Sequence, residues 1–357
     1  MLEFDPKSHQ HQRFNPLKGE WVLVSPHRVN RPWMGQQETC PESGHKKVEQ
    51  TLQNPLCPGA VRPNGQVNPN YTSTFTFQND FPALIDQEFF FEQNGEDDDL
   101  FRREPVTGSC RVMCFHPDPN MTLPLMSVSE ISQVIRQWKE ELVDLGEKFN
   151  WVQIFENKGD IMGCSNPHPH CQIWASSFLP TEPRTKDEQM KKYFEKHQEP
   201  MLVRYVEKEL QKKERIVLEN DDWVVLVPYW AFWPYETIVL PKKPERNSCI
   251  KRLTDLKEDE ETSLADAMKR LTAKYDNLFK CSFPYSMGFH GAPTGSRLNS
   301  DNDHWTLHAV YYPPLLRSAT VKKFVAGQLL AQLQIDVSPE RSASILRSLP
   351  EIHYRNQ

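Results

Sequence analysis

The chain passes twice through the same order of strands and helices, and this repetition limits the folds that it can adopt. Each pass runs strand, strand, helix, strand and then a strand that carries histidines, at residues 168–174 and 304–310. Such an arrangement is typical of helices packed on a sheet in an α+β fold. The sequence therefore predicts a duplicated α+β unit, with an N-terminal half over residues 1–195 and a C-terminal half over residues 196–357.

Short runs rich in β-branched and aromatic residues predict the strands. They are residues 21–24, 71–77, 111–115, 151–155 and 171–175, followed by 216–218, 223–227, 238–240, 285–289 and 305–312. Apolar residues at helical spacing predict a helix after the capping box of Ser127 and Glu130, and another over residues 264–278. Ser338 before Pro339 predicts the start of the last helix. The polar stretch 181–213 is expected to be an exposed helical connector.

The composition excludes several classes of protein. The 357 residues carry 42 basic and 48 acidic side chains, so the net charge of -6 gives no global attraction for nucleic acid or acidic membranes. The longest apolar run, residues 223–233, contains a proline and is shorter than the ~20 residues that cross a bilayer. The N-terminal residues have no secretory pattern. The eight cysteines form no paired framework, so we expect reduced thiols and a cytoplasmic location.

The segment 163–174, Gly-Cys-Ser-Asn-Pro-His-Pro-His-Cys-Gln-Ile-Trp, is the most informative stretch. His168 and His170 are two residues apart in a strand, so their side chains project from one face. The Gly-Cys-Ser-Asn run offers backbone N–H groups and a hydroxyl to an anion such as phosphate. A neutral imidazole has one ring nitrogen free to attack phosphorus, while the other needs an acceptor that fixes the tautomer. Such a pair alone is more often structural or metal-binding, but the full string favours a phosphate-linked histidine.

Seven blocks of sequence together resemble the galactose-1-phosphate uridylyltransferase family of the histidine-triad superfamily. Besides the central segment they are residues 26–33, 79–84, 155–159, 282–288, 290–293 and 312–320, in the family's order over nearly the whole chain. The resemblance implies an α+β fold, in which two histidine-triad-like halves form a mainly antiparallel half-barrel sheet with helices packed outside. It also implies a homodimer, because the segment after Arg317 would complete the partner's site.

The resemblance implies that His170 is the nucleophile of a double displacement. It would attack the α-phosphorus of UDP-glucose, expel glucose 1-phosphate and hold UMP as a phosphoramidate, which galactose 1-phosphate would convert to UDP-galactose. Gln172 stands where hydrolytic relatives carry a third histidine, and an amide cannot act as a general base for water. The resemblance also places Cys164, Ser165 and Asn166 in the phosphate-binding loop. It implies that Arg28 and Arg31 face phosphate, and that Asn79, Asp80 and Asn157 contact uridine and phosphate. Lys323 and Phe324 would reach across a dimer to the sugar.

One metal site of the family lies near the nucleophile and uses two cysteines and two histidines. Cys57 and His168 match it, whereas Asn54 stands at the other cysteine and Pro119 at the other histidine. Two protein ligands do not complete a tetrahedral zinc site, and His116 is not at the matching position. We therefore expect no zinc here, with Cys57 and His168 kept for packing and hydrogen bonding.

The second metal site of the family uses a glutamate and three histidines. His290 and His308 match it, while Val310 stands at the third histidine and Lys186 at the glutamate. The candidates to replace that carboxylate are Glu182, Asp187 and Glu188. Two histidines and one carboxylate can still hold zinc or iron, although more weakly. Because this site is mainly structural in the family, its loss is expected to affect stability before chemistry.

The sugar-facing segment from Lys323 is one residue shorter than the family pattern and lacks its Tyr-Glu pair, which Gln328 would replace in part. Weaker hexose recognition is therefore expected.

Two alternative functions stay open. Another nucleotidylyltransferase or phosphorylase of the superfamily, acting on a dinucleoside polyphosphate or a different sugar phosphate, would keep His170 without the hexose contacts. A non-catalytic sugar-nucleotide-binding or scaffolding descendant would explain the lost metal ligands, but not the intact nucleophile loop.

Overall fold

The centre of the molecule is a single nine-stranded sheet with the order β3-β4-β6-β5-β10-β11-β9-β8-β7, in which neighbouring strands pair antiparallel. The strands are β3 (Phe75–Gln78), β4 (Gly108–Cys114), β5 (Trp151–Lys158), β6 (His170–Ser176), β7 (Ile216–Glu219), β8 (Trp223–Leu226), β9 (Thr237–Pro241), β10 (Tyr285–His290) and β11 (His308–Tyr312). The structure is a computed structural model that describes residues 3–30, 54–88, 100–101, 103–242, 249–319, 321–322 and 332–357.

The sheet is built from two copies of one unit, as the sequence predicts. The first copy is β3, β4, helix α1 (Val128–Gly146), β5 and β6, and the second is β8, β9, helix α4 (Glu258–Phe279), β10 and β11. Their strand orders, β3-β4-β6-β5 and β8-β9-β11-β10, are equivalent, and β5 pairs with β10 at the junction. The strands β6 and β11 therefore occupy equivalent places, one on each side of the central pair.

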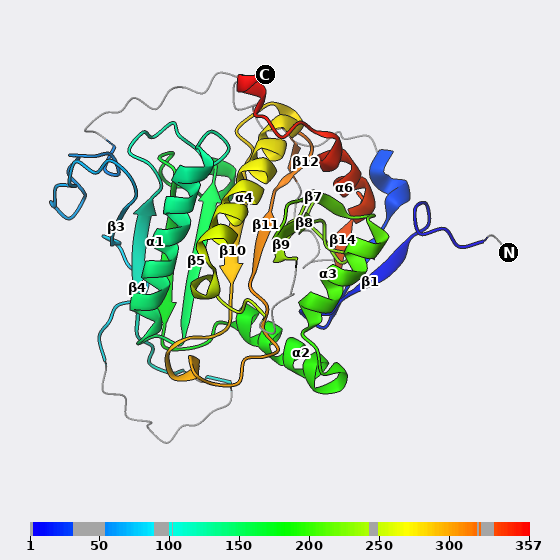
Figure 1. Cartoon of the computed structure of the whole chain (residues 1–357), viewed down its shortest axis with the longest axis horizontal. Helices are drawn as coiled ribbons and strands as arrows, with labels where there is room; N and C mark the ends of the chain where they lie inside the picture. Colours follow the sequence, from blue (N-terminus) through cyan, green and yellow to red (C-terminus); the bar gives the residue numbers. More distant parts are fainter. Residues whose placement is uncertain are drawn as a thin grey trace.

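Helices α1 and α4 lie side by side over one face of the sheet (Figure 1). The capping box of Ser127 and Glu130 begins α1 as expected. From this helix the buried Trp138 packs against Phe289 of β10, and its indole Nε1–H donates to the Cys171 thiol at 3.2 Å. Because strand side chains alternate between faces, the residues on either side of Cys171 point to the opposite face. His170 and Gln172 therefore project away from the helices.

Within the described residues, the opposite face is covered at its two ends and less covered between them. Helices α2 (Thr181–His197) and α3 (Met201–Lys212) cover β8, β9 and β11 with a buried apolar cluster, and Leu56 and Tyr71 pack against β4. Between these covers, five side chains that β6, β5 and β10 present to this face are only half-buried. We call this set the central strip: Gln172, Trp174, Phe155, Asn157 and Ser286.

The remaining elements form two small sheets and a C-terminal helix. Strand β2 (Glu20–Val24) pairs antiparallel with β1 (His11–Asn15) and parallel with β14 (Leu333–Ile335), while β12 (Leu315–Ser318) pairs with β13 (Val321–Lys322). Helix α6 (Pro339–Ser348) begins after Ser338, whose hydroxyl accepts from the Arg341 N–H as the sequence pattern predicts. Figure 1 shows β1 and β14 at the side of the molecule opposite β3 and β4.

Three details differ from the sequence prediction. The segments 71–77 and 305–312 become strands only from Phe75 and His308, and the strands β1, β12, β13 and β14 have no counterpart among the predicted strands. The stretch 181–213 forms two helices, and it is not fully exposed because its Lys186 and Met190 are buried. The cysteines within the described ranges are free thiols. No helix in those ranges combines the length and the apolar character needed to span a bilayer.

Candidate active site

His170 is the first residue of β6, and its ring is fixed by the chain just before it. Its Nδ1 lies 2.7 Å from the carbonyl oxygen of His168. Burial lowers the pKa of His170 below its ordinary value of 6.5, which favours the neutral ring. A neutral ring that donates through Nδ1–H has its lone pair on Nε2. This arrangement leaves one nucleophilic nitrogen on the half-buried side chain, at the end of the central strip.

The loop before His170 is folded by its own polar groups. Gly163 has φ of 79°, in the left-handed region that glycine tolerates, and it ends the short 3-10 turn Asp160–Met162. The thiol of Cys164 donates to the Asn166 carbonyl at 3.0 Å, and the Asn166 side-chain oxygen accepts from the His168 N–H at 2.9 Å. Ser165 is exposed at the tip. The loop thus presents Ser165 to solvent while Cys164 and Asn166 hold its shape.

A second chain segment fastens this loop. The side-chain amides of Asn54 and Asn166 bind each other reciprocally, with N–O distances of 2.8 and 3.1 Å. Asn54 stands where the family carries a zinc-binding cysteine. Two amide hydrogen bonds therefore join the segment before Cys57 to the loop before His170.

Cys57 and His168 also contact each other directly. The thiol sulphur of Cys57 lies 3.7 Å from Nδ1 of His168, whose Nε2 is 2.8 Å from the His116 carbonyl oxygen. Burial lowers the pKa of His168 to about 4 and raises that of the Cys57 thiol. A neutral ring and a protonated thiol can therefore satisfy each other by hydrogen bonding. The His116 ring itself points to Glu130, with Nε2–Oε1 at 3.5 Å.

The central strip adds polar and aromatic groups beside the nucleophile. The Gln172 carbonyl oxygen accepts from the Trp174 indole at 3.0 Å, and Phe155 packs edge-on against Trp174 with ring centroids 5.7 Å apart. The side-chain amide oxygen of Asn157 accepts a hydrogen bond from the Ser286 hydroxyl at 2.5 Å. Sequence reasoning missed Phe155, Trp174 and Ser286 as members of the site. The period of two along β5 and β6 is the signal that places Phe155 and Trp174 on the face of Asn157 and Gln172.

Asn79 and Asp80 lie beyond β4, further along the sheet from His170. The Asn79 N–H donates to the carbonyl of Cys110, which is paired in register with Trp174. The Asp80 carboxylate accepts from the guanidinium of Arg62 at 2.8 Å, and both side chains are buried. Arg62, which the sequence analysis did not single out, therefore sets the position of Asp80.

Arg28 is not brought to His170 within the chain. It lies in the 3-10 helix Pro26–Asn30 that follows β2, and its Nε is 3.3 Å from the carboxylate of Asp336. This part of the molecule is on the far side from β4 (Figure 1). The other predicted contacts on phosphate and sugar lie outside the described residues: Arg31, Lys323, Phe324 and Gln328.

The second histidine cluster contains a lysine. The Lys186 Nζ atom lies 3.3 Å from Nδ1 of His290 and 3.2 Å from Nε2 of His308, and all three side chains are buried. The Asp187 carboxylate is turned toward His304, Trp305 and Arg297 instead.

The other two carboxylates considered as replacement ligands differ in their positions. Glu182 is 3.9 Å from the Lys186 Nζ, and Glu188 is exposed.

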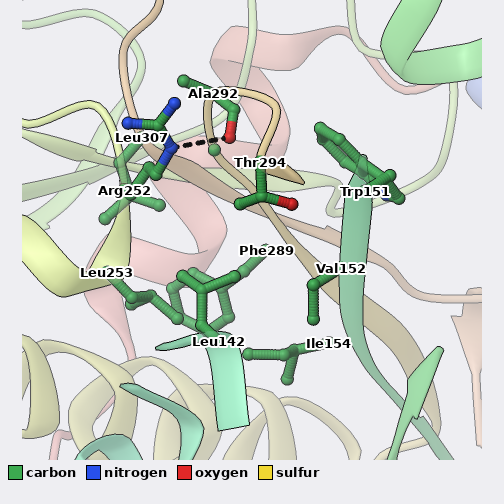
Figure 2. A pocket seen from close by; sticks show the side chains of 11 residues that line it. Leu142, Trp151, Val152, Ile154, Arg252, Leu253, Phe289, Ala292, Thr294 and Leu307 are labelled. Atoms are coloured by element: carbon green, nitrogen blue, oxygen red, sulfur yellow. Dashed lines mark hydrogen bonds between the residues drawn. The ribbon is translucent and has the colours of Figure 1, made fainter. Parts of the chain in front are cut away.

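An apolar pocket beside α1 is not part of this site (Figure 2). Its wall includes Leu142, Phe289 and Trp151, the last at the start of β5, and its rim carries the hydrogen bond from Arg252 Nε to the Ala292 carbonyl. None of the predicted catalytic residues lines it. The chemistry of the described residues is therefore concentrated on the opposite face, around His170.

Comparisons with known proteins decide the family. The family model described as galactose-1-phosphate uridyl transferase, N-terminal domain, matches residues 2–180, and that of the C-terminal domain matches residues 186–357. The chain belongs to the galactose-1-phosphate uridylyltransferase family. The galactose-1-phosphate uridylyltransferase of Rattus norvegicus is 53% identical over 352 residues, which cover 98% of this chain and 90% of the rat protein. The Haemophilus influenzae enzyme is 51% identical over 355 residues, covering 99% and 98%.

Solved structures agree with this assignment at the level of the fold. A structure described as uridylyltransferase superposes with a TM-score of 0.72 at 26% identity, covering 95% of this chain and 98% of its own. An ADP-glucose phosphorylase from Arabidopsis thaliana has the same TM-score at 20% identity, so shape alone does not separate the two activities. The relatives that match over the full length of the chain do separate them. They support a uridylyltransferase over both alternatives considered from the sequence.

The neutral state of His170 predicts the pH dependence of its reactivity. Because burial lowers its pKa below 6.5, the midpoint of its protonation lies below that pH. Attack on phosphorus requires the neutral ring, so the rate of the first half-reaction should fall toward acid pH along a limb whose midpoint lies below 6.5. Rapid-quench measurement of the glucose 1-phosphate burst tests this. An acid limb centred above 6.5 would contradict it.

Proposed function

We propose that this chain transfers a uridylyl group from UDP-glucose to galactose 1-phosphate through a covalent intermediate on His170. The observation that carries the proposal is the 2.7 Å contact between His170 Nδ1 and the His168 carbonyl oxygen. It fixes the tautomer in which Nε2 is the nucleophile. Full-length relatives named galactose-1-phosphate uridylyltransferase support the same substrates.

In the first half-reaction, Nε2 of His170 attacks the α-phosphorus of UDP-glucose. The new P–N bond forms as the bond from this phosphorus to the bridging oxygen breaks, and glucose 1-phosphate leaves with the bonding electrons. The uridylylated ring carries a positive charge. Its Nδ1–H still donates to the His168 carbonyl, which stabilises that charge at no cost in rearrangement. The exposed Ser165 and the backbone of its loop are available to the phosphoryl oxygens.

In the second half-reaction, a phosphate oxygen of galactose 1-phosphate attacks the same phosphorus and releases the neutral imidazole. Gln172 favours this acceptor over water, because an amide cannot remove a proton from a water molecule. Its carbonyl oxygen is held by the Trp174 indole, so its amide nitrogen is the group available to donate to a phosphoryl oxygen. The residue thus steadies the intermediate without promoting its hydrolysis.

Replacement of the nucleophile tests the covalent step. A His170→Gly variant should lose UDP-glucose turnover, and it should recover UDP-galactose formation when uridylyl imidazole is supplied with galactose 1-phosphate, because the small molecule fills the space of the missing ring. The matched control is His308→Gly, which removes the equivalent ring of the second half. The control should use uridylyl imidazole no better than the wild-type enzyme does. UDP-glucose turnover that survives in His170→Gly would refute the assignment.

The working unit that we propose is a homodimer. Two observations support it: the central strip is not covered within the described part of the chain, and Arg28 is held by Asp336 on the far side of the molecule. A second copy related by a two-fold axis can cover the strip and bring its own Arg28 to the phosphates, and each copy then serves the other. The proposal extends to Arg31, Lys323, Phe324 and Gln328, which the resemblance assigns to the same contacts with phosphate and sugar.

Mixed dimers test this exchange of residues. Neither a His170→Ala variant nor an Arg28→Ala variant should be active alone, but a subunit exchange of equal amounts should restore about a quarter of the wild-type activity, since half of the dimers then contain one complete site. A mixture of His170→Ala with His170→Gly is the control and should stay inactive. No recovery in the first mixture, with exchange verified by mass, would show that Arg28 acts within its own chain or not at all.

The proposed chemistry needs no metal ion, because the imidazole supplies the nucleophile and hydrogen-bond donors meet the phosphoryl oxygens. We assign the reaction to the cytoplasm. The scattered cysteines, which lack a paired framework, support a reducing compartment.

A further inference from the structure

The second half of the molecule carries a structural counterpart of the nucleophile. His308 begins β11 as His170 begins β6, and the two strands are equivalent in the duplicated sheet. The His308 Nδ1 lies 2.9 Å from the Thr306 carbonyl oxygen, two residues before it, just as the His170 Nδ1 meets the His168 carbonyl. Both rings therefore have Nε2 as their acceptor atom. Only the surroundings differ: α2 covers His308, whereas His170 borders the central strip.

Helix α2 places an ammonium group on the acceptor atom of His308. The Lys186 Nζ lies 3.2 Å from that Nε2 and 3.3 Å from Nδ1 of His290, with only 2% of the lysine side chain exposed. An ammonium group has three protons, and two of them can go to these rings. Glu182, at 3.9 Å, is the carboxylate that offsets the charge.

The residues present do not fit the metal that the family resemblance implies at this place. Two of the four ligand positions hold Lys186 and Val310, a positive charge and an apolar side chain, and both border one small pocket beside α2. The Asp187 carboxylate faces His304 and Trp305. In the described ranges, no three histidine, cysteine or carboxylate side chains gather as a metal site. A divalent ion would have to use the two ring nitrogens that the ammonium already contacts, and it would be repelled by that charge.

We infer that the Lys186 ammonium is the resident cation of this site, where it takes the place of the family's metal ion and ties α2 to β10 and β11. The same contact keeps the Nε2 atom of His308 unavailable to phosphate, so the duplicated fold retains one reactive histidine and one structural histidine. This inference concerns the stability and metal content of the protein, and it goes beyond the proposed function.

Metal analysis of the full-length enzyme is the first test. After expression with added zinc and iron, the wild-type protein should hold far less than one metal ion per chain at this site, and a chelator should leave its Tm unchanged. A Cys57→Ser variant is measured alongside it, so that metal at Cys57 and His168 is not mistaken for metal here. One tightly held ion per chain that remains in Cys57→Ser and is lost in His290→Gln would overturn the inference.

A pair of substitutions tests the role of the ammonium directly. Lys186→Met keeps the length of the side chain but leaves two buried ring nitrogens without a donor, so the Tm should fall by about 3–8 °C with no response to chelator. Lys186→Glu combined with Val310→His restores the carboxylate and third histidine, and this variant should bind one zinc per chain and lose Tm on chelation. An unchanged Tm in Lys186→Met would overturn the inference, whether or not the double variant folds.

Discussion

The hydrogen bond from His170 Nδ1 to the His168 carbonyl is the interaction on which the chemistry depends. It forms between residues two apart at the start of β6, so the strand geometry that builds the sheet also sets the tautomer of the nucleophile. The loop before it is then held by the Asn54–Asn166 amide pair and the Cys57–His168 contact. These side-chain contacts join the segment around Cys57 to the loop before His170.

Duplication explains why one molecule contains two histidines with the same local geometry and different roles. In both halves the ring at the start of the strand donates through Nδ1 and has Nε2 as its acceptor. The first half leaves that atom beside an open strip, and the second half covers it with α2 and Lys186. The repeated backbone thus fixes the same tautomer in His170 and His308. The element that packs on each ring determines whether its Nε2 atom is covered.

The fold was largely predictable because its signals are local. Strand composition, the capping box at Ser127 and the repeated order of elements led to the duplicated sheet, and the histidine segment led to the proposed nucleophile. The features that the sequence does not predict depend on packing between distant residues. The polarity of residues 181–213 predicts exposure, and only the seating of α2 on β10 and β11 buries Lys186. The partnership of Arg62 with Asp80 and the distance of Arg28 from His170 likewise have no local signal.

Incubation with UDP-glucose alone tests the central claim most directly, because a double displacement must stop at the covalent enzyme when no acceptor is present. Intact-mass spectrometry under an alkaline quench should show one uridylyl group per site, and peptide mapping should place it on His170. Addition of galactose 1-phosphate should remove the group and yield UDP-galactose. Binding of UDP-glucose without any adduct, or an adduct on His308 or another residue, would contradict the account.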